Sequence, residues 1–231
     1  MQRKVRAAVL QQKSIEILYE DDCYVAFDKP PGILVIPSPK KEKNTLIHLV
    51  NQQYAPRAGE YRLHPCHRLD RDTSGVILFA KGKKNQQLMM REFFKRNVKK
   101  KYIALVQGRP ENIQGTIRSD IVDYDGRKFF PKPRPKTAIT HYRVLQFRKN
   151  YCIVEVFPIT GRTNQIRIHF SEMGYPLLGD RKYAEGKNFL VKFKRAALHA
   201  SELEWMHPVY HRRIKVQSPL PEDLEELINR N

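Results

Sequence analysis

The chain has 231 residues, enough for one large domain or two small ones, and 41% of them are hydrophobic. Lysine and arginine number 43 against 24 acidic residues, giving a formal net charge of +19, which favours a polyanion as partner. No apolar run approaches the roughly 20 residues of a membrane span and the N-terminus lacks the apolar region of a signal peptide, so we expect a soluble, intracellular protein.

The N-terminal part is predicted to hold an arm and a hairpin. Residues 1–13 are basic and polar, and we interpret them as an arm in front of one domain, 14–231. Segments 15–19 and 24–27 flank an acidic turn and therefore favour a β-hairpin. Two prolines and a glycine make 29–32 a tight turn, because they do not continue a strand.

The middle of the chain alternates helical and strand patterns. Asn44 is predicted to cap a helix that stops before Pro56. A buried strand is expected at 76–80, where an apolar run lies between glycines, and a helix is expected at 84–96, where apolar residues follow helical spacing. A further strand is predicted over 102–106.

The second half continues this mixture. In chain order we predict a hairpin tip at Asp125-Gly126, an extended basic linker over Pro131–Pro135, a hairpin of 137–147 and 151–157, a helix over 164–173, strands at 196–205 and 213–216, and a final helix from Pro221. Strands outnumber helices and pair as hairpins. The pattern therefore predicts an α+β fold with a mixed, largely antiparallel sheet and flanking helices.

Basic residues cluster, and several clusters carry aromatic side chains. The clearest pairings are Phe93-Phe94 with Lys95-Arg96, Phe129-Phe130 with Arg127-Lys128, and the segment 189–193. Cationic groups bind phosphates, and aromatic rings stack on unpaired bases. This combination favours nucleic acid over an anionic membrane surface as the partner.

Three cysteines, Cys23, Cys66 and Cys152, are widely separated and form no C-x-x-C pair. Their spacing indicates neither a disulfide framework nor a zinc site. We therefore expect a reducing, cytoplasmic location, and we expect the chain to be a monomer. Four histidines, His67, His199, His207 and His211, are interpreted as structural, because no carboxylate or cysteine completes a metal-ligand pattern with them.

One carboxylate stands among arginines and small hydroxyl residues directly before the predicted strand 76–80. The segment reads His67-Arg68-Leu69-Asp70-Arg71-Asp72-Thr73-Ser74-Gly75. Asp70 would lie in the loop that enters a rigid strand, which is a favourable place for a reactive acid. We interpret Asp72 as a residue that orders this loop through local backbone hydrogen bonds.

Four separated segments, taken together and in order, resemble the RluA family of pseudouridine synthases. They are Tyr19-Glu20-Asp21-Asp22 to Lys29-Pro30-Pro31-Gly32, the Asp70 segment, Lys100-Lys101-Tyr102, and Gly161-Arg162-Thr163-Asn164-Gln165-Ile166-Arg167. The Leu198-His199-Ala200 and Met206-His207-Pro208 segments are also similar to that family. The resemblance covers about residues 15 to 221, and it implies a fold with a central cleft.

The resemblance implies isomerisation of a uridine within RNA, without a cofactor or metal. The bond from N1 to C1′ breaks, the uracil turns in the pocket, and C5 bonds to C1′. Asp70 would be the catalytic carboxylate, which either attacks C1′ or removes a sugar proton to give a glycal. The residues alone agree, because a carboxylate is a competent partner for a sugar C1′.

The resemblance also assigns the residues around Asp70. Arg167 would form an ion pair with Asp70 and keep it ionised, and the ring of Tyr102 would pack on the uracil. Arg68 would enter the RNA stack as the uridine leaves it, or would serve only to hold a phosphate. We expect four further residues to contact RNA: His67, Arg71, Arg162 and Asn164. Asn164 stands where the family usually has histidine, and it lacks titration near neutral pH.

Two other functions remain open on the sequence. A non-catalytic RNA-binding protein would explain the charge but gives Asp70, Tyr102 and Arg167 no task. An RNA base glycosylase would use a similar carboxylate, but the sequence offers no second acid at a matched position. The substrate is expected to be ribosomal or transfer RNA, and the sequence does not distinguish between them.

Overall fold

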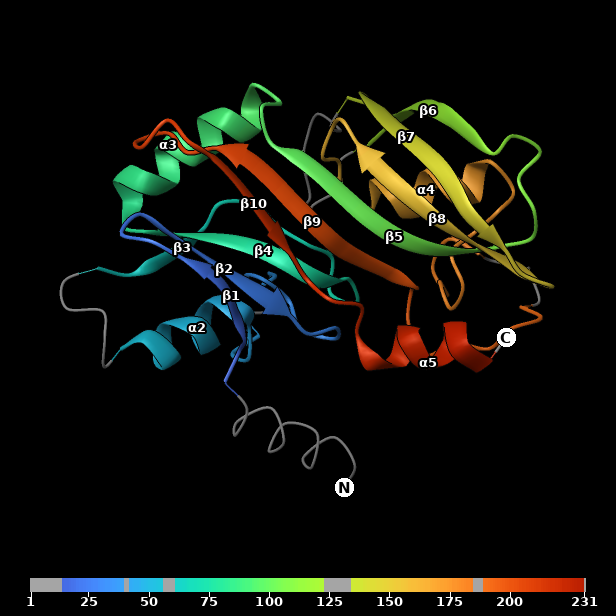
Figure 1. Cartoon of the computed structure of the whole chain (residues 1–231), viewed down its shortest axis with the longest axis horizontal. Coiled ribbons are helices and arrows are strands. Elements are labelled where there is room, and N and C mark those ends of the chain that lie inside the picture. Colours follow the sequence, from blue (N-terminus) through green and yellow to red (C-terminus); the bar gives the residue numbers. More distant parts are fainter. Residues whose placement is uncertain (1–13, 40–41, 56–60, 123–133, 185–188, 231) are drawn as a thin grey trace.

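The computed structural model describes residues 14–39, 42–55, 61–122, 134–184 and 189–230 (Figure 1). The predicted arm 1–13 and the predicted hairpin tip Asp125-Gly126 lie outside the described residues, as do residues 131–133 of the predicted linker.

Ten strands and four helices are present in the described ranges. The strands are β1 Ile17–Glu20, β2 Tyr24–Lys29, β3 Leu63–Pro65, β4 Ser74–Lys81, β5 Lys99–Gln107, β6 Gln114–Ile121, β7 Lys136–Phe147, β8 Tyr151–Pro158, β9 Leu198–Met206 and β10 Arg213–Gln217. The helices are α2 Leu46–Tyr54, α3 Lys83–Phe94, α4 Gln165–Glu172 and α5 Glu222–Arg230.

All ten strands join one sheet, in the order β1-β2-β4-β9-β5-β8-β7-β6, with β3 on β4 and β10 on β9. Every pairing is antiparallel except that of β4 with β9. The predicted α+β class with a mixed, largely antiparallel sheet is therefore confirmed. Figure 1 shows β1 to β4 at one end of the sheet and β5 to β8 at the other, with β9 between them.

Strand alternation distributes the core over both faces of the sheet. On β2, Val25 and Phe27 pack with α2, whereas Tyr24 and Ala26 point to the other face and pack in a cluster with Met89 of α3. At the other end of the sheet, α4 and α5 cover opposite faces in the same way. The alternation of side chains along a strand thus explains why helices flank the sheet on each side.

The two ends of the sheet meet at a short parallel contact between β4 and β9. Ser74 pairs with His199, and Gly75 pairs with Ala200. Gly75 has a φ of +107°, and a Cβ placed there would lie 2.2 Å from the carbonyl oxygen of Ala200. Only glycine fits this close approach. The loop that carries Asp70 enters β4 directly before this contact.

Most predicted elements are present, with two kinds of difference. Helix α2 has its N-cap at Thr45 rather than Asn44, because the Thr45 carbonyl accepts the first N–H groups, from His48 at 3.0 Å and Leu49 at 3.1 Å. Strands β3 and β6 were not predicted. β3 has only three residues, and β6 is largely exposed, so neither has a strong apolar pattern.

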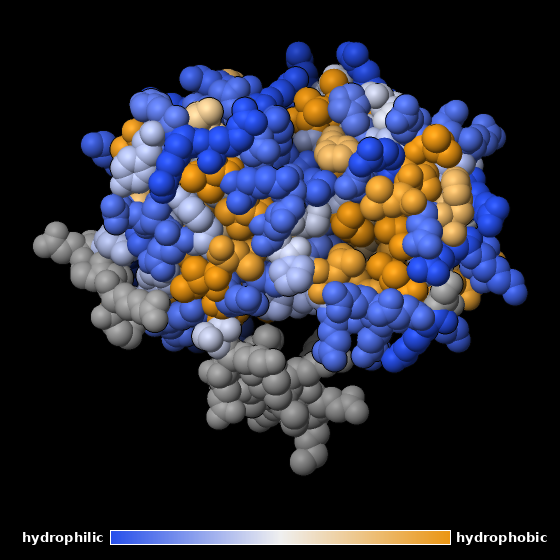
Figure 2. All heavy atoms as spheres, viewed as in Figure 1, coloured by the Kyte–Doolittle hydropathy of each residue, from blue (hydrophilic) through white to orange (hydrophobic). Residues whose placement is uncertain are grey.

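Hydrophilic residues cover much of the face shown in Figure 2, with apolar patches between them. In the described part of the chain, no helix is long and apolar enough to cross a membrane.

Candidate active site

A cavity of about 510 Å³ opens where the Asp70 loop, β5 and the segment before α4 meet. This volume is in the range of small-ligand pockets. Six of the eight predicted site residues line it: Asp70, Tyr102, Arg68, His67, Arg162 and Asn164. Residues far apart in sequence are therefore brought to one place. Arg71 and Arg167 are not among its lining residues.

Hydrogen bonds from the Lys29 side chain hold the backbone of the Asp70 loop in place. The Lys29 side chain is fully buried, and its ammonium donates to the carbonyl oxygens of Pro30 at 3.0 Å, Arg71 at 2.9 Å and Thr73 at 2.8 Å. The Thr73 N–H in turn donates to the Asp70 carbonyl at 3.2 Å. Burial lowers the pKa of Lys29 to about 7. The loop therefore holds its path through main-chain contacts.

Two opposing effects act on the pKa of the Asp70 carboxyl. Burial raises its pKa, while the positive charges of Arg167, Arg68 and Lys29 and the backbone N–H of Asn164 act to lower it. The net shift of the pKa is upward. The cations thus oppose the effect of burial, and a carboxylate that is less hydrated than in water suits a reactive oxygen.

Tyr102, on β5, lies beside Asp70. Burial raises the pKa of its hydroxyl, and the negative charge of Asp70 raises it further. The hydroxyl is therefore protonated at neutral pH. Its ring packs against the apolar clusters on both sides of the site, so a rigid aromatic face borders the cavity.

In the structure Arg167 forms an ion pair with Asp180 rather than the expected ion pair with Asp70. Arg167 donates from Nε to Oδ2 of Asp180 at 2.7 Å and from Nη2 to Oδ1 of Asp180 at 2.8 Å. Its remaining nitrogen, Nη1, donates to Oδ1 of Asn164 at 2.8 Å. A planar guanidinium engaged in this way has a fixed orientation. Among the described residues, Arg167 and Asp70 do not form an ion pair within 4.0 Å. The charge of Arg167 therefore lowers the pKa of Asp70 from a longer distance.

Asp180 is the site residue that the sequence reasoning missed. Its side chain is 1% exposed. Burial alone would raise the pKa of Asp180, but the hydrogen bonds and charge of Arg167 lower it below its ordinary value. Gly179 precedes it with a φ of +71°, where a Cβ would lie 2.1 Å from the Arg195 carbonyl oxygen. A glycine next to an acid, directly after the apolar pair Leu177-Leu178, is the signal that was available.

Asn164 begins α4 in the left-handed conformation, with a φ of 55°. Asparagine tolerates this region better than most residues. Its side-chain oxygen accepts from Arg167, and its Nδ2 donates to the Tyr183 hydroxyl at 3.0 Å. The residue that replaces the usual histidine therefore contacts Arg167 directly.

The other predicted RNA contacts differ in their surroundings. Arg68 is exposed at the cavity rim. His67 accepts the Leu78 N–H at Nε2, at 3.0 Å, and burial lowers its pKa to about 3, so the ring is neutral. Arg71 lies outside the cavity lining and pairs with Glu42 at 3.2 Å.

Arg162 is half-buried in the cavity wall. Its Nε and Nη2 each lie 3.4 Å from the carbonyl oxygen of Thr137, to which they donate. These are long hydrogen bonds, so the guanidinium retains donors for another acceptor.

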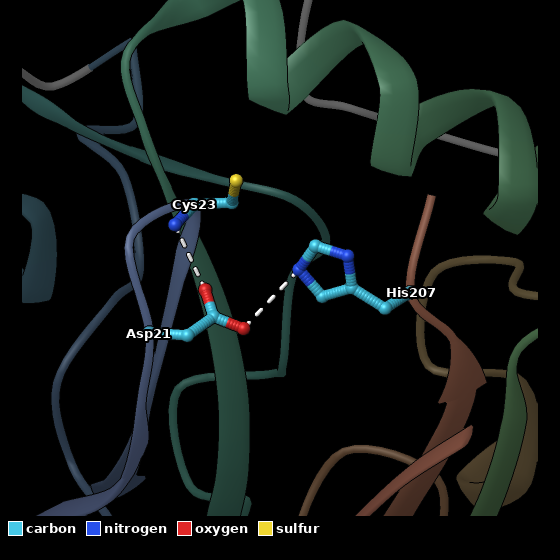
Figure 3. A group of neighbouring side chains, drawn as sticks. All are labelled: Asp21, Cys23 and His207. Carbon is cyan, nitrogen blue, oxygen red and sulfur yellow. Dashed lines mark hydrogen bonds and ion pairs between the residues drawn. The ribbon is translucent and has the colours of Figure 1, made fainter. Parts of the chain in front are cut away.

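In the described part of the chain, one group of three potential metal ligands lies together: Asp21, Cys23 and His207 (Figure 3). Asp21 Oδ1 accepts the N–H groups of Cys23 at 2.8 Å and Tyr24 at 2.7 Å, and its Oδ2 faces His207 Nε2 at 3.1 Å. His207 Nδ1 accepts two further backbone N–H groups, which places the ring proton on Nε2. These contacts engage both carboxylate oxygens of Asp21 and both ring nitrogens of His207, so the arrangement favours a structural tie between two turns.

The chain matches the RNA pseudouridylate synthase family over residues 23–172. It is 34% identical over 221 residues to uncharacterized RNA pseudouridine synthase YhcT of Bacillus subtilis, which covers 92% of this chain and 71% of that protein. It is 32% identical over 228 residues to ribosomal large subunit pseudouridine synthase D of Haemophilus influenzae, covering 93% of this chain and 70% of that protein. The solved structure of human RNA pseudouridylate synthase domain containing 4 is similar at a TM-score of 0.79 and 26% identity, covering 99% of this chain and 96% of that one.

The fold, the cavity and these similarities define an RNA-modifying isomerase. The chain belongs to the RNA pseudouridylate synthase family, and the family predicted from the ordered motifs is confirmed.

Proposed function

We propose that Asp70 is the carboxylate that acts on the ribose of the target uridine. One observation carries this assignment: among the described residues that line the cavity, Asp70 is the single acidic group. The carboxylate either attacks C1′ and is displaced when C5 bonds to that carbon, or removes a sugar proton to form a glycal and returns the proton when C5 adds to C1′. In both routes the N1–C1′ bond breaks and the C5–C1′ bond forms. The C5 proton then leaves to solvent, and N1 gains a proton, so the reaction is a balanced isomerisation.

The neighbouring residues take supporting roles in this proposal. The ring of Tyr102 packs on the uracil, and its protonated hydroxyl is placed to assist the transfer of the C5 proton. Arg167 supplies positive charge that favours the ionised form of Asp70. Arg68, exposed at the rim, fills the space in the RNA stack that the extruded uridine leaves. His67, Arg162 and Asn164 form the wall against which the nucleotide rests.

Ribosomal RNA is the substrate that we propose, with transfer RNA as the alternative. Support comes from the relatives named ribosomal large subunit pseudouridine synthase D and from the net charge of +19. No step of the proposed reaction is assigned to a metal or cofactor. We propose that 14–231 acts as one domain and as a monomer in the cytoplasm. The cysteines at 23, 66 and 152 are free and buried, which supports a reducing compartment.

Tritium release tests the reaction. A large-subunit ribosomal RNA transcript carrying tritium at uridine C5 is incubated with wild-type protein, Asp70→Asn and the matched control Asp72→Asn. We expect wild type and Asp72→Asn to release tritium, and Asp70→Asn to release none. Asp70→Asn should still bind RNA with nearly unchanged affinity, because phosphate contacts dominate binding and depend steeply on salt.

The same experiment separates the other two functions. Free uracil and abasic sites in the RNA would identify a glycosylase. Tight binding of both ribosomal and transfer RNA, with uridines unchanged, would identify a binding protein. Turnover by Asp70→Asn at the wild-type rate would refute the assignment of Asp70.

A further inference from the structure

Phe94 ends α3 at the rim of the cavity, and the residue is 89% exposed. Its neighbour Phe93 is fixed instead, since its ring lies 4.9 Å from the ring of His67. A phenyl ring with this exposure contributes little to the folded core. One face of the cavity entrance is therefore an aromatic surface that the isomerisation itself does not use.

Two cations, Arg96 and Lys100, line the same cavity as Phe94. Lys100 donates from Nζ to the Thr160 carbonyl at 3.0 Å, and Arg96 lies close enough for its charge to disfavour the charged form of Lys100. Burial and the charge of Arg96 together lower the pKa of Lys100 to about 8. Within the described ranges, neither side chain forms an ion pair with a carboxylate. Like charges held together in this way attract an anion.

The turn after α3 brings Arg96 and Lys100 to the cavity. After α3 the chain turns through Arg96, which has a φ of 62°, and its N–H donates to the Phe93 carbonyl at 3.1 Å. A non-glycine residue in this conformation is uncommon. The turn ends the helix at Phe94 and leads directly into β5, which carries Lys100.

We propose that Phe94, Arg96 and Lys100 form a subsite for the nucleotide next to the target uridine, with its base stacked on Phe94 and a phosphate held by the two cations. The inference rests on the proposed function, because it takes the uridine to be extruded toward Asp70. Extrusion removes a stacking partner from the base on each side of the uridine, and Arg68 takes the place of that partner for only one of them. An aromatic ring replaces that partner for any base, and it favours an unpaired nucleotide at this position.

Fluorescent RNA tests the subsite. Two single-stranded RNAs of about ten nucleotides carry one central uridine among cytidines, with 2-aminopurine on the 5′ side in one and on the 3′ side in the other. We expect wild-type protein to quench the fluorescence of one of them. Phe94→Ala should abolish this quenching and weaken binding about tenfold, whereas Phe94→Trp should retain both. Lys100→Gln should weaken binding and reduce the salt dependence by about one phosphate contact.

Phe147→Ala is the matched control. Phe147 is an exposed phenylalanine that pairs with Cys152 at the far end of the β7–β8 hairpin from the cavity residue Pro158. This variant should bind and quench like wild type. Equal binding and quenching by Phe94→Ala and wild type would overturn the subsite, and so would an equal loss in Phe147→Ala, or wild-type protein that quenches neither RNA.

The outcome is separable from that of the proposed function. On the ribosomal transcript, Phe94→Ala should raise KM for tritium release and leave kcat close to wild type. Quenching that depends on Phe94, together with turnover by Asp70→Asn, would support the subsite and refute the catalytic assignment. Tritium release that depends on Asp70 but not on Phe94 would refute the subsite alone.

Discussion

Replacement of Asp180 by asparagine tests how the positive charge near Asp70 is oriented. Asp180 accepts two short hydrogen bonds from Arg167, and the two side chains are only 1% and 13% exposed. Hydrogen bonds to charged groups contribute about 1.5 to 3 kcal/mol each, and an amide keeps one acceptor oxygen. Asp180→Asn should therefore lower the free energy of unfolding by roughly 3 kcal/mol.

The same change should reduce catalysis. Without its carboxylate partner, the guanidinium of Arg167 loses its fixed orientation toward Asn164 and the cavity. A displacement of about 1 Å in a catalytic arrangement can cost on the order of a hundredfold in rate, and we expect a fall in kcat of that order. RNA affinity should change little, because Asp180 does not line the cavity.

Urea unfolding and tritium release measure the two effects. Asp180→Asn, Arg167→Gln and the double variant form a cycle, and we expect a coupling free energy of at least about 1 kcal/mol between the two positions. Additive effects, or a loss of stability in Asp180→Asn below about 0.5 kcal/mol, would contradict the role of the buried pair.

The difference in stability between wild type and Asp180→Asn should depend on pH, and the pKa of Asp180 determines the direction of that dependence. The folded-state pKa of Asp180 lies below its ordinary value, so the unfolded state binds the proton more tightly. Its stabilisation is complete above the unfolded pKa of about 3.9 and is lost as the pH falls through the lower folded value. The difference between wild type and Asp180→Asn should therefore be largest near neutral pH and shrink in acid.

Other parts of the site give further expectations. The rate of tritium release should rise with pH along an acid limb whose midpoint lies above the ordinary pKa of an aspartate, because the pKa of Asp70 is raised and the proposed reaction uses its ionised form. Arg167→Gln should move that limb to higher pH, and an unmoved limb would argue against the charge effect. Tyr102→Phe should lower kcat about a hundredfold with RNA affinity retained, and an unchanged kcat would remove the hydroxyl from the reaction. Gly75→Ala should lower the melting temperature by about 6 °C or more, because its Cβ would lie 2.2 Å from the Ala200 oxygen, and differential scanning calorimetry would detect this.

The sequence predicted the elements that have a strong local pattern. The β7–β8 hairpin, β4 and α3 have regular apolar spacing, and the structure places them within a few residues of the expected bounds. β6 was missed because half of its residues are exposed and its apolar signal is weak. The parallel pairing of β4 with β9 joins residues more than a hundred positions apart, which no local pattern encodes.

The site residues likewise divide into those that the sequence predicted and those that it did not. Asp70, Tyr102 and Asn164 were predicted together and line one cavity. The partner of Arg167 was not predictable, because two carboxylates compete for it and the choice depends on how α4 begins and how the chain turns at Gly179. Such a choice is made by tertiary geometry rather than by residue type.

The ammonium of Lys29 has a consequence for redesigning this enzyme. It donates to main-chain oxygens of Arg71 and Thr73, so these contacts do not depend on the side chains at positions 71 and 73. Position 71, whose side chain pairs with Glu42 outside the cavity, is therefore a place where substitutions can change RNA preference while these contacts of Lys29 with the loop backbone are kept.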